Sequence, residues 1–214
     1  MLPVHSRRFS RTVRNSVLNQ RRNIRFMLKS LKGHFLIATR KLNDQNFYRS
    51  VVLIVEHNNE GATGLIVNRP SSFSITNALS RYFDMPKLED LVFMGGPVEP
   101  NGMFALHNAG DLEKAKDAIV PGLFMGSSPE VFEQVVWRIS EGDPNLDFRI
   151  FFGCAGWAPS QLESELDRMD WLTTPATAED IFEIDPYDLW DTLHGRAMEE
   201  RRFLPQETAH PEWN

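Results

Sequence analysis

The chain has 214 residues, 42% of them hydrophobic, which suits one large or two small soluble domains. No apolar run approaches the ~18 residues of a membrane-spanning helix, and the single cysteine excludes an internal disulfide framework and favours a cytoplasmic location. Residues 1–32 contain nine Lys or Arg and no acid, whereas the remainder has 14 basic and 29 acidic residues, a net charge of −15. Because this acidic remainder repels phosphate backbones, we expect nucleic acid to bind only through residues 1–32.

Residues 1–30 form a basic N-terminal extension that we expect to be disordered. Three interpretations are open. The first is a translated stretch upstream of a start at Met27. The second is an organellar transit peptide, since such peptides are rich in Arg and poor in acids. The third is an arm that binds nucleic acid or an anionic membrane. Residues 198–214 are polar and are expected to form a loose tail, which leaves residues 31–197 as one domain.

The first half of this domain predicts short strands and one helix. Val51 to Val55 is a continuous apolar run rich in β-branched residues, as in a buried strand. A turn at 56–61 returns the chain, which predicts a hairpin with a longer loop. Ser74 is a candidate N-cap for the helix. The expected elements are strands at 35–38, 51–55, 64–67, 91–94 and 103–106 and a helix at 74–83.

The second half predicts further strands and the longer helices. Pro129 after the candidate cap Ser128 begins a helix through Ile139. The apolar run at 148–152 reads as a strand that ends in a tight glycine turn, followed by a helix with a capping box between Ser160 and Glu163. The remaining expected elements are strands at 122–125 and 171–174, a helical turn from Thr177 and a helix at 186–196 with Leu189, Trp190 and Leu193 buried.

Cys154 lies in the glycine turn and raises the question of a nucleophile. A nucleophile elbow has glycine two residues before and two after the nucleophile. Gly156 satisfies the second position, but Phe152 occupies the first. We therefore interpret Cys154 as a small buried thiol.

Polar side chains gather where the predicted strands end. Strand ends beside glycine turns are common places for binding sites, so we propose a candidate binding cluster there. The alternative is that each side chain only satisfies nearby loop backbone groups. The cluster comprises Glu56, His57, Asn58, Asn68, Arg69, Gly95, Gly96, His107, Trp157 and Gln161.

Metal, cofactor and nucleic-acid motifs are not evident. No two of the six histidines are spaced as H-x-x-x-H, and the cysteine is distant from them in sequence, so we expect neither a metal nor a cofactor. No helix-turn-helix, zinc-finger or aromatic RNA-binding pattern occurs. No set of nucleophile, base and orienting group is recognisable in the sequence, so we assign no catalytic residue.

Several motifs in the same order resemble the YqgE/AlgH family, from about Leu31 to Leu193. The clearest is the segment from Gly156-Trp157 to Gln161-Leu162-Glu163, which is similar to the family's G-W-x-x-G-Q-L-E-x-E hallmark, except that Ser160 stands where glycine is usual. Cys154 likewise stands where the family usually has an aromatic residue. Further matching pieces are Gly33–Ala38, Asn46–Val52, Glu56–Asn58, Gly61–Pro70 and Gly95–Val98.

The resemblance implies a compact α+β domain with a mixed, strongly bent sheet, a partial barrel, flanked by helices. It implies no defined activity, although some members are labelled transcriptional regulators. We predict a cytoplasmic binding or regulatory protein without enzymatic activity, whose protein or small-molecule partner is unknown. The alternative is a small-molecule-binding protein or enzyme that uses the strand-end cluster.

Overall fold

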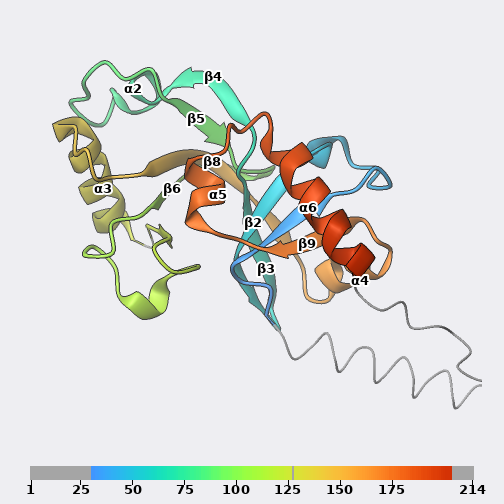
Figure 1. Ribbon diagram of the computed structural model, residues 1–214. Coiled ribbons are helices and arrows are strands. Elements are labelled where there is room, and N and C mark those ends of the chain that lie inside the picture. Colours follow the sequence, from blue (N-terminus) through green and yellow to red (C-terminus); the bar gives the residue numbers. More distant parts are fainter. Residues whose placement is uncertain (1–29, 127, 204–214) are drawn as a thin grey trace, which may run out of the picture. The chain divides into compact units, whose positions relative to one another are not determined.

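A computed structural model describes residues 30–126 and 128–203 (Figure 1), so most of the predicted N-terminal extension and residues 204–214 lie outside the described part. The contacts within the chain divide it into two units, residues 1–31 and residues 32–214. The described part of the second is an α+β domain with the following elements: β1 (His34–Ala38), η1 (Gln45–Phe47), β2 (Val51–Asn58), β3 (Gly61–Ile66), β4 (Pro70–Ser74), α2 (Ile75–Leu79), β5 (Leu91–Met94), β6 (Val98–His107), η2 (Ala115–Asp117), β7 (Phe124–Met125), α3 (Pro129–Glu141), β8 (Phe148–Trp157), α4 (Gln161–Asp167), β9 (Trp171–Pro175), α5 (Ala178–Phe182) and α6 (Leu189–Phe203).

One mixed sheet of nine strands organises the domain, in the order β4-β5-β8-β3-β2-β1-β9, with β6 also paired to β8 and β7 to β6. All pairs are antiparallel except β5 with β8. The path begins at β4 and ends at β9, which do not pair, so the sheet is mixed as expected but is not closed into a barrel.

The long strand β8 joins the two parts of the sheet. Its first half pairs with β5 and β6, and its last residues, Ala155 to Trp157, pair with β3. The prediction that this strand ends at Phe152 in a glycine turn is wrong. Gly153 has a left-handed φ of 69°, which bends the strand without ending it, and the ladder continues to Trp157.

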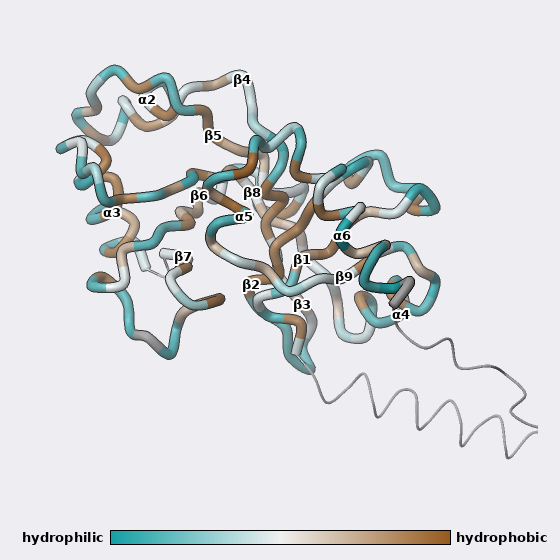
Figure 2. Tube along the Cα trace, viewed as in Figure 1, coloured by the Kyte–Doolittle hydropathy of each residue, from teal (hydrophilic) through white to brown (hydrophobic). Residues whose placement is uncertain are grey.

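Two apolar clusters pack on the sheet. In Figure 2 the hydrophobic residues concentrate along the strands of the sheet and beneath the helices. One lies among β1, β2, β3, α5 and α6 and includes Phe35, Leu53 and Leu193. The other lies between β6, β8 and the helices α2 and α3 and includes Leu79, Val135 and Ile150. As predicted, Leu189, Trp190 and Leu193 are buried. Helix α6 continues through Phe203, past the predicted domain boundary at residue 197.

The predicted caps at Ser74 and Ser128 are confirmed, since their side chains accept from the backbone N–H groups of Asn77 and Val131. Helix α2, however, ends at Leu79, earlier than predicted.

The capping box at Ser160 is wrong. Ser160 has φ 63°, so it lies in the left-handed region, and its hydroxyl makes no cap hydrogen bond. The side-chain oxygen of Gln161 instead accepts from the N–H of Ala158. A left-handed backbone suits glycine, which explains why glycine is usual here in the family that the sequence resembles.

Candidate functional site

The strand-end cluster does not form one site, because its members lie at opposite ends of the β2–β3 hairpin. The antiparallel register places Asn58 opposite Gly61 at the loop and Val52 opposite Ile66 at the other end. Residues 56–58 are therefore at the loop end, whereas Asn68 and Arg69 follow the far end of β3. Both groups follow the ends of neighbouring strands in the sequence, but the two strands run in opposite directions, so these ends lie at different edges of the sheet.

Asn68 and Arg69 hold the loop that precedes β2. The side-chain oxygen of Asn68 accepts from Val51 N at 2.8 Å, and its amide donates to Arg49 O at 2.9 Å. Arg69 donates to the carbonyl of Asn46, and burial lowers its pKa. These contacts satisfy loop backbone groups, as the alternative interpretation expected.

Gly95 and Gly96 allow the chain after β5 to touch β8. A Cβ on Gly95 would lie 2.2 Å from the carbonyl oxygen of Gly153, and one on Gly96 would lie 2.3 Å from the carbonyl of Cys154. Cys154 is buried, and this burial raises the pKa of its thiol, with the charge of Glu99 acting in the same direction. The neutral thiol is a poor nucleophile, in agreement with its interpretation as a core residue.

His107 ends β6 inside the protein. Its ring is fully buried, stacks on Phe124, and has no hydrogen-bond partner for either nitrogen among the described residues. Burial lowers the pKa of His107 to about 4; the Arg138 cation acts in the same direction and Asp111 opposes it. The imidazole is therefore neutral at pH 7 and sits apart from the other predicted site residues.

Trp157 and Gln161 meet at a pocket of about 380 Å³ beside helix α4. One carboxylate oxygen of Glu165 accepts from the indole N–H groups of Trp157 and Trp171, each at 2.8 Å, and the other accepts from Gln161 at 3.0 Å. The Phe47 ring stacks on Trp157. Trp157 is only 6% exposed, so this arrangement is first of all a buried aromatic cluster held by one carboxylate.

The loop end of β2 contacts the same helix. His57 Nε2 lies 3.0 Å from a carboxylate oxygen of Glu163. His57 pairs with Ala62, and Ala62 with Trp157, so the three side chains share one face of the sheet under α4. Asn58 instead donates to Glu56 at 3.0 Å and accepts from the N–H of Glu60.

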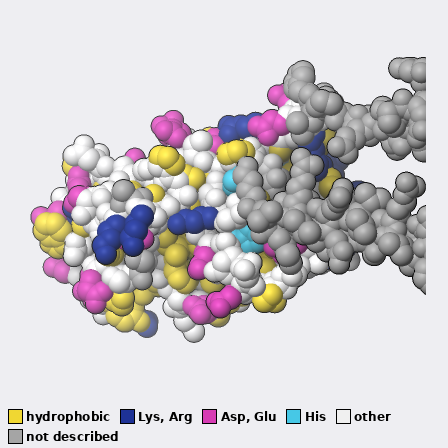
Figure 3. Space-filling view, turned by 90° about the horizontal axis from the view of Figure 1, so that it is seen from below, with side chains coloured by type: hydrophobic (Ala, Val, Ile, Leu, Met, Phe, Trp, Pro, Cys, Tyr) yellow, Lys and Arg dark blue, Asp and Glu magenta, His cyan; other side chains and the backbone are white. Residues whose placement is uncertain are grey.

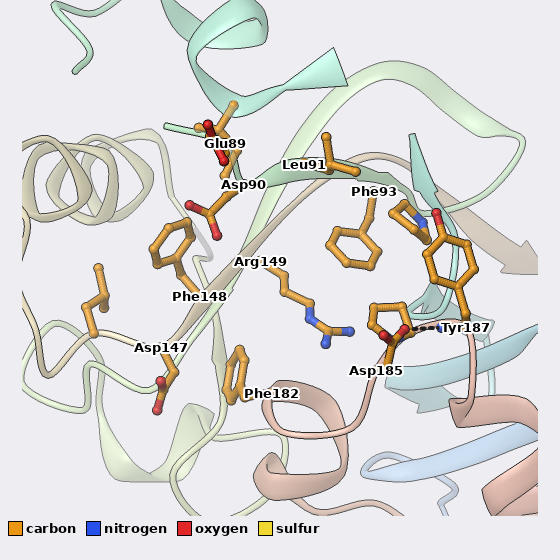
Figure 4. Close-up of a pocket in the computed structure, with 14 residues that line it drawn as sticks. Glu89, Asp90, Leu91, Phe93, Asp147, Phe148, Arg149, Phe182, Asp185 and Tyr187 are labelled. Atoms are coloured by element: carbon orange, nitrogen blue, oxygen red, sulfur yellow. Dashed lines mark hydrogen bonds between the residues drawn. The ribbon is translucent and has the colours of Figure 1, made fainter. Parts of the chain in front are cut away.

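A larger pocket, of about 640 Å³, opens around Arg149, near the start of β8 (Figure 4). The volume falls within the range of small-molecule sites. Four segments supply its walls: the chain from β4 into α2, residues 89–93, residues 146–149, and the end of α5 with the chain that follows it. Its lining residues are Pro70, Ile75, Glu89, Asp90, Leu91, Phe93, Leu146, Asp147, Phe148, Arg149, Phe182, Asp185, Pro186 and Tyr187.

Arg149 is a buried cation with no carboxylate partner in the part of the chain that the structure describes. Its residue is 8% exposed, and it forms no ion pair with any carboxylate in the described chain. One terminal nitrogen donates to Val67 O at 2.9 Å and the other to Ile184 O at 3.5 Å. The guanidinium also lies 4.8 Å from the centre of the Phe93 ring. A guanidinium has more N–H donors than these two acceptors use.

The guanidinium nevertheless stays charged. Burial lowers the pKa of Arg149 to about 10, and the nearby charge of Asp185 opposes this shift. A buried cation is normally paired, because leaving it unpaired costs free energy. Arg149 points into the pocket, toward Asp185, in Figure 4. The pocket thus contains a permanent positive charge that an anionic group could pair.

This pocket was not predicted from the sequence, although the sequence contains one signal of it. Arg149 interrupts the apolar run of β8 between Phe148 and Ile150. A charged residue inside a buried strand needs a partner or a function. What the sequence could not show is that residues 89–93 and 182–187 lie beside it.

The described residues contain no group of three His, Cys, Asp or Glu side chains placed to hold a metal ion. Nor does any helix in the described ranges have the length and apolarity needed to cross a membrane.

The sequence model of the AlgH-like family matches residues 35–201. This chain belongs to the AlgH-like family. The match covers nearly every element that builds the sheet and both pockets, from β1 into α6.

Relatives and solved structures agree with this membership. A UPF0301 protein of Myxococcus xanthus is 38% identical over 80% of this AlgH-like chain and 94% of its own length. The solution structure of AlgH from Pseudomonas aeruginosa has a TM-score of 0.64 at 30% identity, covering 85% of this chain and 97% of that one. Protein DIP2367 of Corynebacterium diphtheriae, a crystal structure, has a TM-score of 0.61 at 25% identity, covering 78% of this chain and 87% of that one.

Proposed function

We propose that this AlgH-like chain is a cytoplasmic ligand-binding protein with a regulatory rather than an enzymatic role, and that it binds a small carboxylate at Arg149. The observation that carries the proposal is the buried, unpaired Arg149 guanidinium pointing into a pocket of about 640 Å³. A carboxylate is the natural partner, because its two oxygens match the planar fork of a guanidinium.

The composition of the pocket supports binding over catalysis. Its described lining contains no Ser, Thr, Cys, His or Lys, the residues that most often act as nucleophile or as a base near neutral pH. Apolar and aromatic side chains form much of the wall, with the buried Arg149 at the floor and four carboxylates, from Glu89, Asp90, Asp147 and Asp185, elsewhere in the lining. Pockets of this composition bind and orient small molecules.

The experiment compares ligand binding by two Arg→Lys variants. The monoanions hexanoate and butanoate serve as probes in thermal unfolding of the full chain. A ligand at 100 times its Kd stabilises by about 2.7 kcal/mol, which for a domain of this size raises Tm by roughly 5–10 °C. Arg149→Lys keeps the charge but loses the two-pronged hydrogen bonding, so we expect Kd to rise at least about tenfold, the equivalent of about 1.4 kcal/mol.

The matched control is Arg168→Lys, because Arg168 lines the other pocket and is already paired with Asp170 at 2.7 Å. This variant should bind the probe as the parent does. Urea unfolding without ligand checks that both variants remain folded. The proposal is rejected if neither carboxylate raises Tm, or if Arg168→Lys weakens binding as much as Arg149→Lys.

A further inference from the structure

We infer that the ligand of the Arg149 pocket is a basic α-amino acid, with its carboxylate on Arg149 and its amines at the acidic rim. This inference rests on the proposed function, because it assigns a fuller ligand to the same pocket. It is carried by the charges, the aromatic walls and the placement of the rim around Arg149.

The charge of the lining favours a ligand that is itself net positive. One arginine shares the pocket with four carboxylates, from Glu89, Asp90, Asp147 and Asp185. A monoanion would pair with Arg149 but would meet uncompensated negative charge around it. A phosphate or other dianion would meet more repulsion still. A molecule with one carboxylate and two amines satisfies both signs.

The carboxylates stand where a bound amine can reach them. All four belong to exposed residues, whereas Arg149 is buried, so the anion-binding group is at the floor and the cation-binding groups are at the rim. They come from separate segments: Glu89 and Asp90 precede β5, Asp147 precedes β8, and Asp185 follows α5. In Figure 4, Asp185 lies beside the guanidinium, while Asp90 and Asp147 lie nearer the Arg149 backbone. Two amines on one molecule can therefore meet different carboxylates.

The aromatic walls suit both the chain and the charge of such a ligand. Phe148 and Phe182 are half-buried in the lining, and Tyr187 is exposed at its edge. Methylene groups gain free energy against these rings, and an ammonium over an aromatic face gains a cation–π interaction. The face of Phe93 already has this contact with Arg149 itself.

The experiment removes one group of lysine at a time. Titration calorimetry with the full chain measures L-lysine, 6-aminohexanoate, which lacks the α-amine, cadaverine, which lacks the carboxylate, and hexanoate, which lacks both amines. We expect L-lysine to bind most tightly, 6-aminohexanoate about tenfold more weakly, and cadaverine and hexanoate more weakly again. The double variant Asp90→Asn, Asp185→Asn should weaken L-lysine at least about tenfold and leave hexanoate unchanged or tighter.

The control is Asp188→Asn, which removes a carboxylate near the pocket but outside its lining and should leave L-lysine binding unchanged. If hexanoate binds through Arg149 as tightly as L-lysine, the proposed function stands and this inference is overturned. If cadaverine binds as tightly as L-lysine, Arg149 does not recognise a carboxylate and both proposals are overturned. Absence of L-lysine binding at millimolar concentration, with hexanoate still bound, overturns this inference alone.

Discussion

Trp157 belongs both to the hydrophobic core and to the lining of a pocket. It packs on Phe47 and Trp171 and donates its indole N–H to Glu165. The glycine-rich end of β8 offers little apolar surface of its own, so the indole covers the end of the sheet. Its 6% exposure identifies it as a core residue before it is anything else.

We expect Trp157→Ala to lower the free energy of unfolding by about 3–5 kcal/mol, through lost burial and the cavity that remains. Trp137→Ala is the matched control, since Trp137 is 62% exposed on α3 and its removal should cost less than about 1 kcal/mol. Urea unfolding of both variants makes the comparison. An unchanged midpoint for Trp157→Ala would show that the tryptophan serves a binding surface and not the core.

At the scale of the element, β8 joins the two parts of the sheet. It can do so because the strand continues past Gly153, where a turn was predicted. Before Gly153 it pairs with β5 and β6, at Cys154 it still pairs with Val98 of β6, and from Ala155 to Trp157 it pairs with β3. This change of partner places Arg149 and Trp157 on the two portions of one strand, so each pocket is built on a different part of β8.

Gly153→Ala tests this role against a glycine of the same conformation. Gly153 and Gly142 both have φ 69°, but a Cβ on Gly153 would lie 2.4 Å from Gly96 O, whereas one on Gly142 meets nothing within 4 Å. Gly142→Ala should cost about 1–2 kcal/mol for the left-handed backbone alone. Gly153→Ala should cost at least about 3 kcal/mol, because the β5–β6 connection at Gly96 must also move away from β8. Equal midpoints in urea would contradict the close packing of β8 on the β5–β6 connection.

At the scale of the whole molecule, charge divides the chain. Residues 1–32 carry nine cations and no acid, and the remainder has a net charge of −15. On the face drawn in Figure 3, the described surface carries acidic side chains in several places, with only small groups of Lys and Arg between them. Among the described side chains visible on that face, no continuous basic stripe of the kind that a phosphate backbone needs is present.

A chain that starts at Met27 should keep its folding and lose its affinity for DNA. Its free energy of unfolding should fall by less than about 1 kcal/mol, because every described strand and helix lies after residue 33. Mobility shifts at two salt concentrations should show weak, steeply salt-dependent DNA binding by the full chain only. Tight, sequence-selective binding by residues 27–214 would instead support the transcriptional-regulator label.

Local chemistry in the sequence was sufficient for much of the fold. The caps at Ser74 and Ser128, the buried run of β2 and the buried face of α6 depend on neighbouring residues, so spacing alone predicts them. Family membership likewise follows from motifs that are contiguous in the chain.

The Arg149 pocket and the division of the strand-end cluster depended on tertiary structure. Antiparallel pairing sends Asn58 and Asn68 to opposite ends of the hairpin, which no local pattern reveals. Arg149 is recognisable as unusual in the sequence, but its surroundings come from segments more than 30 residues away on both sides, Phe93 before it and Asp185 after it. Secondary structure follows from interactions within a few residues, whereas a pocket forms only when the sheet brings distant segments together.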